Sequence, residues 1–483
     1  MKYGMKTILM RYVLAAALVV GGLMMTTGCK EVMSKLDNPV SSYLEMQTSD
    51  VELLVGQKNL RAATTISSEP VRYASADESV AVVDELTGLV TAVGTGTTTI
   101  IASVPNSADG CYLAGMLQYT VSVKKIAIDF DKSDVELYVG DGHTRQITYK
   151  ELDEAVVTYV SDNPAVATVD AVGGQVVAVA PGVANVKVRV TYADFYVDES
   201  VSYQVSVFNL INLASLTADY EVKDFDRLYG STTHALKMPA GTTVSLAGVN
   251  VSTTDMNALS CAGNATVILA EGTTNTLKSK GNGMAGIKAG SAGTTLTIKG
   301  AGSLDVTGAA GGAGIGTDKA GTSGDILIES GNIVAQSIQY GAGIGTGDGG
   351  ICGNISIAGG TVTATGGYFA AGIGSGDNYS GEAVCGNITI SGGTVTAKGG
   401  DYAAGIGTGV EEMITSNICG NISITGGTIV ATGYDDADDD YDAYDVGPGC
   451  NLSEGTLSVG TVNVTTSIKN ENGDDAKIYG SAK

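Results

Sequence analysis

Several residue types are scarce in this sequence, and each scarcity excludes a class of function. There is no tryptophan, histidine occurs only as His143 and His234, and 27 basic residues face 51 acidic ones. Zinc sites built on several histidines and HExxH proteases are therefore excluded. A pI near 4.3 argues against nucleic-acid binding, which depends on lysine and arginine. With 43% hydrophobic residues, the chain is too apolar to be disordered.

The first residues have the pattern of an export signal. Lys2, Lys6 and Arg11 precede an apolar run over 12–25, which is too short to span about 30 Å of hydrocarbon. The run ends at Thr-Thr-Gly before Cys29, which resembles a bacterial lipobox, although a plain secretory signal with an incidental cysteine is the alternative. The resemblance implies a signal peptide over 1–28, a lipidated Cys29, a linker over 29–43 and a membrane anchor, with the protein at the outer membrane or cell surface.

Two consecutive segments repeat one pattern. Ser49–Gly56 recurs 84 residues later as Ser133–Gly140, and Val80–Asp84 matches Val166–Asp170. Short alternating Val, Thr and Ile runs are separated by Gly, Pro and Asp turns, as in a small antiparallel sandwich. The sequence therefore predicts two duplicated domains, over 44–124 and 125–208.

The second copy carries the more specific motif. Ser161–Asp170, followed by Gly174–Gly182, resembles the bacterial Ig-like group 2 domain, and the first copy departs from it at Ala76–Ser79. Such domains are mostly spacers in surface proteins and adhesins. The resemblance therefore implies a stalk.

From about residue 209 the glycines follow a regular phase. Ala-Gly-Ile recurs with its glycine at positions 286, 314, 343, 372 and 405, while Cys-Gly-Asn-Ile begins at Cys352, Cys385 and Cys419. No proline occurs between Pro239 and Pro448, as expected where nearly every N–H enters a ladder. Near-constant repeats with loops of variable length are typical of a solenoid.

Each repeat contains three short strand-like pieces whose alternate residues are apolar. Ile355, Ile357, Val362 and Ala364 are expected to face inward, so stacking of coils about 4.8 Å apart buries a continuous column. The predicted fold is all-β: two tandem Ig-like β-sandwiches, then a three-sheet parallel β-helix over 209–483 with its clearest coils at 281–450. The repeats resemble β-helical carbohydrate-binding domains of bacterial surface proteins.

Stacked coils place equivalent residues in columns, and one such column is aromatic. Three residues before the Ala-Gly-Ile glycine, or its Val-Gly-Pro-Gly equivalent, stand Tyr340, Phe369, Tyr402 and Tyr444. Sugar rings stack on aromatic faces, so this strip is a candidate polysaccharide platform. An intramolecular aromatic stack that only rigidifies the turn is the alternative.

Acidic residues form a second column and one dense run. Asp318, Asp348, Asp377 and Glu411 follow the same glycine, and we expect solvated loop tips there in preference to carboxylates bridged by Ca²⁺. Residues 435–445 form an insertion at the aromatic turn. Either a solvated acidic loop or a Ca²⁺ or cationic-ligand site is consistent with its carboxylates, which include Asp435, Asp436, Asp438, Asp439, Asp440 and Asp442.

Two further columns are expected to be structural. Cys352, Cys385 and Cys419 are predicted to stack as buried thiols, since three cysteines cannot all pair with one another. The asparagines two residues after each are expected to hydrogen-bond the backbone or one another.

Many parallel β-helices are polysaccharide lyases or hydrolases, but the expected residues are missing. No arginine follows Arg227, and the acidic residues lie mainly in loops. We therefore predict a non-catalytic, monomeric surface lipoprotein that presents a carbohydrate-binding β-helix to a polysaccharide or host glycan. A protein-binding adhesin or structural surface protein is the main alternative, and a polysaccharide lyase or hydrolase the second.

Overall fold

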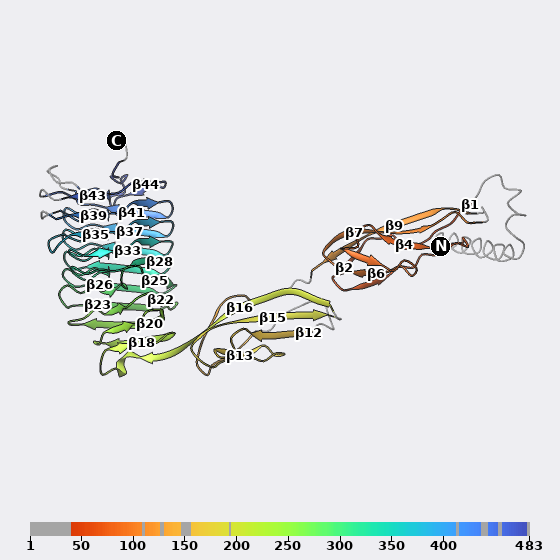
Figure 1. Cartoon of the computed structure of the whole chain (residues 1–483), viewed down its shortest axis with the longest axis horizontal. Coiled ribbons are helices and arrows are strands. Elements are labelled where there is room, and N and C mark those ends of the chain that lie inside the picture. Colours follow the sequence, from red (N-terminus) through yellow and green to blue (C-terminus); the bar gives the residue numbers. More distant parts are fainter. Residues whose placement is uncertain are drawn as a thin grey trace, which may run out of the picture.

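The computed structural model describes residues 40–108, 112–125, 130–145, 156–192, 195–411, 415–435, 443–452 and 456–480. Within these ranges the regular structure is almost entirely β, with one 3-10 turn at Leu213–Ser215. Figure 1 shows three units in chain order, two small sandwiches followed by a tall stack of coils.

Each of the first two units pairs a four-stranded sheet with a three-stranded one. In the first unit the four strands lie in the order β2 (Val51–Leu54), β9 (Gly115–Lys124), β7 (Gly96–Val104), β4 (Arg72–Ser75). The three strands facing them lie in the order β3 (Lys58–Leu60), β6 (Leu89–Ala92), β5 (Ala81–Val83). A further two-stranded parallel pair joins β1 (Val40–Ser41) to β8 (Tyr112–Leu113).

The second unit repeats the strand order of both the four-stranded and the three-stranded sheet. Its larger sheet contains β10 (Val135–Tyr138), β16 (Phe195–Asn212), β15 (Gly182–Tyr192) and β12 (Val156–Ser161), and its smaller sheet β11 (Gly142–Thr144), β14 (Gln175–Ala178) and β13 (Ala167–Val169). Separate apolar cores fill the two sandwiches. The predicted duplication is therefore a duplication of structure.

One strand belongs to both the second unit and the stack of coils. β16 pairs with β10 and β15, and its last residues, Asn209–Asn212, pair in parallel with β18 (Asp226–Thr232). Arg227 on β18 reaches back to Glu136 on β10 at 2.5 Å, and its guanidinium lies 5.5 Å from the ring centre of Phe208. The boundary predicted at 208/209 thus falls inside a continuous strand, so the two units are joined without a flexible linker.

The coils build three long parallel sheets. The first contains β20 (Thr242–Thr253), β22 (Ala265–Leu269), β25 (Thr295–Gly300), β28 (Asp325–Ile328), β32 (Ile355–Ile357), β36 (Ile388–Ile390), β40 (Ile422–Ile424) and β44 (Val462–Val464). The second begins on the later part of β20 and continues with β23 (Thr274–Ser279), β26 (Ser303–Gly308), β29 (Asn332–Ser337), β33 (Thr361–Thr365), β37 (Thr394–Lys398), β41 (Thr428–Thr432) and β45 (Ile468–Lys469).

The third sheet is narrow because its strands are mostly two residues long. It contains β17 (Tyr220–Glu221), β19 (Leu236–Met238), β21 (Leu259–Cys261), β24 (Ile287–Lys288), β27 (Ile315–Gly316), β30 (Ile344–Gly345), β34 (Ile373–Gly374), β38 (Ile406–Gly407) and β42 (Val446–Gly447). A fourth, short sheet carries the cysteine column in β31 (Ile351–Cys352), β35 (Ala383–Cys385) and β39 (Asn417–Cys419) and ends at β43 (Leu457–Val459). The sequence predicted the three long sheets and not the fourth.

Side chains that alternate along the strands fill the interior of the coils. Ile355, Ile357, Val362 and Ala364 are buried as expected, within one continuous cluster that extends from Leu213 to Ile468. The residues between them point outward and are partly or fully exposed. This period-two pattern confirms the predicted parallel β-helix and leaves its turns available for other roles.

Candidate functional site

A column of aromatic residues lies at one turn of the β-helix. Tyr340, Phe369 and Tyr402 have left-handed backbones, with φ of 62°, 65° and 60°, and the equivalent positions in earlier coils are the left-handed Gly283 and Gly311. A left-handed backbone costs a residue with a Cβ about 1–2 kcal/mol, whereas glycine adopts it freely. Three coils therefore keep an aromatic side chain at a position whose backbone conformation favours glycine.

Hydrogen bonds between coils hold this turn in place. The carbonyl oxygen of Tyr340 accepts the N–H of Asp377 at 2.9 Å, and that of Phe369 accepts the N–H of Val410 at 2.9 Å. The carbonyl of Tyr402 accepts from Cys450 at 2.7 Å. Each left-handed residue thus presents its carbonyl to a later coil, which offsets part of the conformational cost.

The rings stack along the column, but its end differs from the prediction. Ring centres are 6.2 Å apart for Tyr340 and Phe369 and 6.0 Å apart for Phe369 and Tyr402, both with planes inclined by 27°. Tyr434 lies at the end of the column, with its ring centre 4.6 Å from that of Tyr402. Tyr444 packs edge-on against Tyr479 at 5.3 Å instead.

The insertion explains this exchange. Tyr434 follows Gly433 directly, just before the insertion, whereas Tyr444 lies at the far end of the insertion and packs against Tyr479 of the C-terminal segment. The prediction of Tyr444 came from counting three residues back from the glycine. Such a count is valid only where the loops between coils have constant length.

A groove of about 730 Å³ borders the aromatic column near the C-terminal end of the β-helix. Its walls come from five successive coils at the ends of β29, β33, β37, β41 and β45: residues 337–338, 366–368, 398–401, 432–435 with 443 and 445, and 470–472 with 475 and 477. Ile338 and Tyr368 are 56% and 52% exposed there. Tyr368 contacts Phe369, with ring centres 6.4 Å apart, and Tyr434 contacts Tyr402, so the groove and the column form one continuous aromatic surface.

The C-terminal segment closes one end of the groove. Lys398 on β37 pairs with Glu471 at 2.8 Å, and the Glu471 N–H donates to Thr432 Oγ1 at 3.0 Å. Asp445 accepts N–H bonds from Gly433 at 2.8 Å and Lys477 at 2.7 Å. Burial raises the pKa of Asp445 above its ordinary value.

The carboxylate column does not consist of solvated loop tips, so that expectation is wrong. Asp348, Asp377 and Glu411 are almost completely buried. Asp348 accepts from Ser380 N at 2.8 Å and from Lys319 Nζ at 3.0 Å. Polar hydrogens from neighbouring coils replace water around the Asp348 carboxylate, which indicates a structural role.

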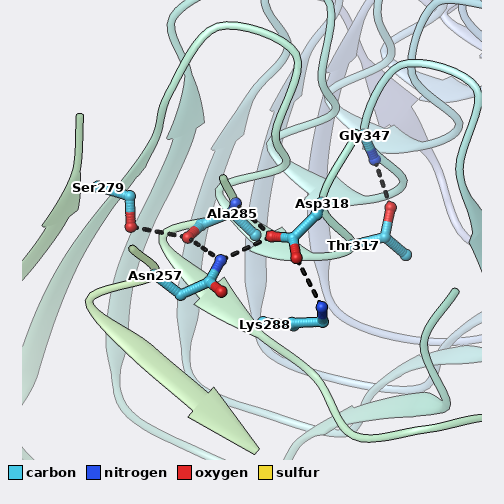
Figure 2. Close-up of polar contacts among 7 residues, drawn as sticks. All are labelled: Asn257, Ser279, Ala285, Lys288, Thr317, Asp318 and Gly347. Carbon is cyan, nitrogen blue, oxygen red and sulfur yellow. Dashed lines mark hydrogen bonds and ion pairs between the residues drawn. The ribbon is translucent and has the colours of Figure 1, made fainter. Parts of the chain in front are cut away.

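Asp318 begins this column and shows how a carboxylate is held (Figure 2). Its oxygens accept from Asn257 Nδ2 at 2.6 Å, from the Ala285 N–H at 2.9 Å and from Lys288 Nζ at 2.6 Å. Nearby, Ser279 Oγ donates to the Ala285 carbonyl at 2.7 Å. Residues from several coils therefore meet at one partly buried carboxylate.

A column of buried hydroxyl groups was not predicted from the sequence. Thr317, Thr346 and Thr408 accept the N–H of Gly347, Gly376 and Gly449 at 2.7, 2.7 and 2.9 Å, and Figure 2 shows the first of these bonds. Ser375 accepts from Gly409 at 3.1 Å in the same way. Each of these hydroxyl residues ends a recurring Gly-Ile-Gly-Thr or Gly-Ile-Gly-Ser sequence, and this repeat is the pattern from which the column could have been predicted.

The cysteine and asparagine columns match their predictions. Cys352, Cys385 and Cys419 are buried thiols paired in register across β31, β35 and β39. Burial raises the pKa of Cys352, and a hydrogen bond with Cys419 together with burial raises the pKa of Cys385. The side-chain oxygen of Asn354 accepts from Asn387 N at 2.9 Å, and the same bond joins Asn387 to Asn421.

Most of the predicted metal and lipid positions lie outside the described residues. Asp435 is described and exposed, whereas Asp436, Asp438, Asp439, Asp440, Asp442 and Cys29 are not described. Among the described residues, no group of three or more His, Cys, Asp or Glu side chains is placed to hold a metal ion. Calcium binding by the insertion and lipidation of Cys29 therefore stay predictions.

Comparison with protein families identifies both kinds of module. Residues 46–113 and 128–203 match the bacterial Ig-like domain (group 2), and residues 326–348, 355–377, 388–410 and 422–443 match the β-helix repeat. The chain carries two bacterial Ig-like domains and a β-helix. Together these Ig-like domains and β-helix repeats point to a surface or adhesin-like protein. β-Helix repeats occur in enzymes and in non-enzymes alike.

Similarity to individual proteins is remote. No curated protein matches the sequence significantly. The S-layer protein rSbsC(31-844) is 17% identical over 35% of this chain and 28% of its own, with a TM-score of 0.21. Human protocadherin-24 EC1-2 is 16% identical over 34% of this chain and 97% of its own, with a TM-score of 0.17. The Ig-like and β-helix chain thus spans less than a third of the first of these proteins.

In the ranges that the structure covers, no helix has both the length and the apolar character needed to cross a membrane.

Proposed function

We propose that this protein is a non-catalytic, carbohydrate-binding surface lipoprotein in which two Ig-like domains support the β-helix, and that the groove beside the aromatic column is the binding site. The observation that carries the proposal is the exposed Tyr368 in the groove wall, in contact with the stacked column. Sugar rings present C–H patches that pack on aromatic faces, while their hydroxyls need polar partners. A groove lined by tyrosine and by charged or backbone polar groups supplies both.

The backbone conformation of the column supports the same proposal. Tyr340, Phe369 and Tyr402 keep left-handed backbones that the earlier coils assign to glycine. Conformational strain held in place by the surrounding structure is common at functional sites. Phe369 and Tyr402 also pack against the buried Val410, Ala443 and Cys450, so the strained aromatic turn supports a binding role in addition to a structural one.

Replacing tyrosines of the groove is expected to weaken glycan binding. Removal of one aromatic stacking surface at Tyr368 or Tyr434 should lower the affinity about 2- to 12-fold, because such contacts contribute roughly 0.5–1.5 kcal/mol each. A glycan array with the exported chain would first identify a bound glycan. Titration calorimetry would then compare wild type, Tyr368→Ala and Tyr434→Ala.

The matched control for this experiment is Tyr379→Ala. Tyr379 is 61% exposed on the same β-helix but does not line the groove, so its removal should leave the affinity unchanged. Equal affinity for all four proteins would rule out the groove as the site. Absence of binding to any glycan, with capture of an envelope protein instead, would favour a protein-binding adhesin.

Hydrolysis is a second candidate because Asp445, a carboxyl group with a raised pKa, lines the groove. A raised pKa is what a general acid in a glycosidase requires. However, both carboxylate oxygens of Asp445 already accept backbone N–H bonds, which favours a structural role. If the protein released reducing sugar from the bound glycan and Asp445→Asn abolished that release, hydrolysis would replace simple binding as the function.

Anchoring through Cys29 is the part of the proposal that concerns location. In the proposed lipoprotein, Cys29→Ser removes the thiol that would carry the acyl chains and should move the protein from the membrane fraction to the soluble exported fraction. Stable anchoring needs more than one acyl chain, and the variant would carry none at this residue. The shift to the soluble fraction should therefore be nearly complete. Membrane retention of Cys29→Ser at the wild-type level, measured by fractionation and immunoblotting, would contradict lipidation at this residue.

A further inference from the structure

The groove is acidic, and its lysines are already engaged. Seven charged side chains line it: Lys398, Lys477, Asp401, Asp435, Asp445, Glu471 and Asp475. Two positive and five negative groups leave a formal charge of 2 − 5 = −3. The Nζ of Lys398 contacts both carboxylate oxygens of Glu471, at 3.0 and 2.8 Å. Pairing of Lys398 with Glu471 removes one charge of each sign, so the groove keeps its negative net charge and disfavours anionic ligands.

Two of these carboxylates face solvent beside the aromatic wall. Asp401 lies one residue before Tyr402 of the column, and Asp435 one residue after Tyr434 at the column's end. Both are exposed, and neither takes part in an ion pair with a lysine or arginine of the described residues. By contrast, Asp475 pairs with Lys469 at 2.7 Å, and Asp445 is enclosed by backbone N–H groups. Asp401 and Asp435 therefore remain to meet a ligand.

The shape of the groove adds a second constraint. Its walls come from five successive coils, and parallel strands lie about 4.8 Å apart, so it extends for roughly 19 Å along the helix axis. Tyr368, Asp401 and then Tyr434 with Asp435 follow one another on three successive coils along this line. Aromatic and anionic groups therefore alternate in the direction in which a linear polymer would lie.

From these observations we propose that the groove binds a linear oligosaccharide of amino hexoses, with ring faces on Tyr368 and Tyr434 and protonated amino groups at Asp401 and Asp435. This inference rests on the proposed carbohydrate-binding function and names its ligand class. A polyuronate is disfavoured, because its carboxylates would meet a groove of the same charge. A single sugar would occupy only part of the surface.

The test compares matched oligosaccharides on the full exported chain. The probes are the β-1,4-linked hexamers of glucosamine and of N-acetylglucosamine, the glucosamine dimer and a galacturonate hexamer, titrated by calorimetry at pH 6. The glucosamine hexamer should bind roughly 2- to 30-fold more tightly than the acetylated hexamer, which is the range that two exposed ion pairs provide. The dimer should bind more weakly than its hexamer, and the galacturonate hexamer should not bind.

Two sets of variants distinguish a built site from general attraction to an acidic protein. The double variant Asp401→Asn with Asp435→Asn should bring the two hexamers to within about twofold of each other while the acetylated hexamer binds as before. The control Glu271→Gln removes an exposed carboxylate of the same β-helix that does not line the groove, and it should keep the preference.

Each outcome separates the inference from the function on which it rests. If the preference survives in the double variant, or if the galacturonate hexamer binds equally well, the inference is overturned. If the acetylated hexamer binds through Tyr368 without any preference for amino groups, carbohydrate binding stands and the inference falls. If no hexamer and no arrayed glycan binds, the proposed function itself fails.

Discussion

Replacement of Gly374 by alanine is expected to break the β-helix at the centre of its regular coils. Gly374 lies on β34 with φ of 135°, and a Cβ there would collide with the carbonyl oxygen of Gly407 on the next coil. That carbonyl accepts the Ser375 N–H at 3.0 Å, so relief of the collision would also break a bond between coils. Strain at this backbone and overpacking together should cost about 3–5 kcal/mol.

The same substitution at Gly381 provides the control. Gly381 has a similar φ of 147° but no heavy atom within 4 Å of an added Cβ. Gly381→Ala should therefore lose only the backbone cost, about 1–2 kcal/mol of stability. The difference in stability between the two variants then measures the cost of the collision at Gly374. Hydrogen exchange resolved along the chain is the suitable measurement, because coils of a solenoid open locally. Equal protection in both variants would mean that adjacent coils can separate without loss of stability.

Removal of Arg145 is expected to destabilise the second Ig-like domain by about 2–4 kcal/mol. Its guanidinium donates to the carbonyl of Asp131 at 2.9 Å, to that of Ser133 and to the Ser133 hydroxyl, and it lies 4.7 Å from the ring centre of Tyr203. Hydrogen bonds to a charged donor contribute about 1.5–3 kcal/mol, and a partly desolvated cation–π contact adds to them. Thermal unfolding of Arg145→Ala, with hydrogen exchange to locate the change, would measure the loss.

Arg145→Lys separates geometry from charge in this experiment. Lysine keeps the positive charge but cannot donate from a planar fork, so most of the loss should remain. Arg61 occupies the equivalent place in the first domain, where it lies 4.4 Å from the ring centre of Tyr119 and donates to Gln47 and Ser49 carbonyls. Arg61→Ala should therefore destabilise the first domain and leave the second unchanged. Full stability of Arg145→Ala would show that the apolar core alone orders these domains.

The sequence was informative wherever residues repeat at constant spacing. Identical coils must place identical residues in register, so the inward Ile355 and Val362, the thiols from Cys352 onward and the asparagine bonds from Asn354 onward were all predictable. The duplicated Ig-like domains were predictable for the same reason. In each case the partner of a residue is its own equivalent in the next coil or the next copy.

Prediction failed where a partner comes from a part of the chain without that period. The buried Asp348 depends on a lysine and a serine supplied by two different coils, and a carboxylate in a loop gives no local sign of either. Tyr434 replaced Tyr444 in the column because an insertion broke the count. β16 joined the second Ig-like domain to the coils because strand pairing, and not composition, determines where a strand ends.

The sequence by itself therefore determined the modules, the interior of the β-helix and the turn at which aromatic residues gather. Only the tertiary structure decided that Tyr368, Asp401, Tyr434 and the C-terminal segment around Glu471 enclose one groove. The physical reason is that periodic burial depends on neighbours at a fixed distance along the chain. A groove depends on which side chains the turns of five coils and the closing segment leave exposed, and that is known only once they are packed together.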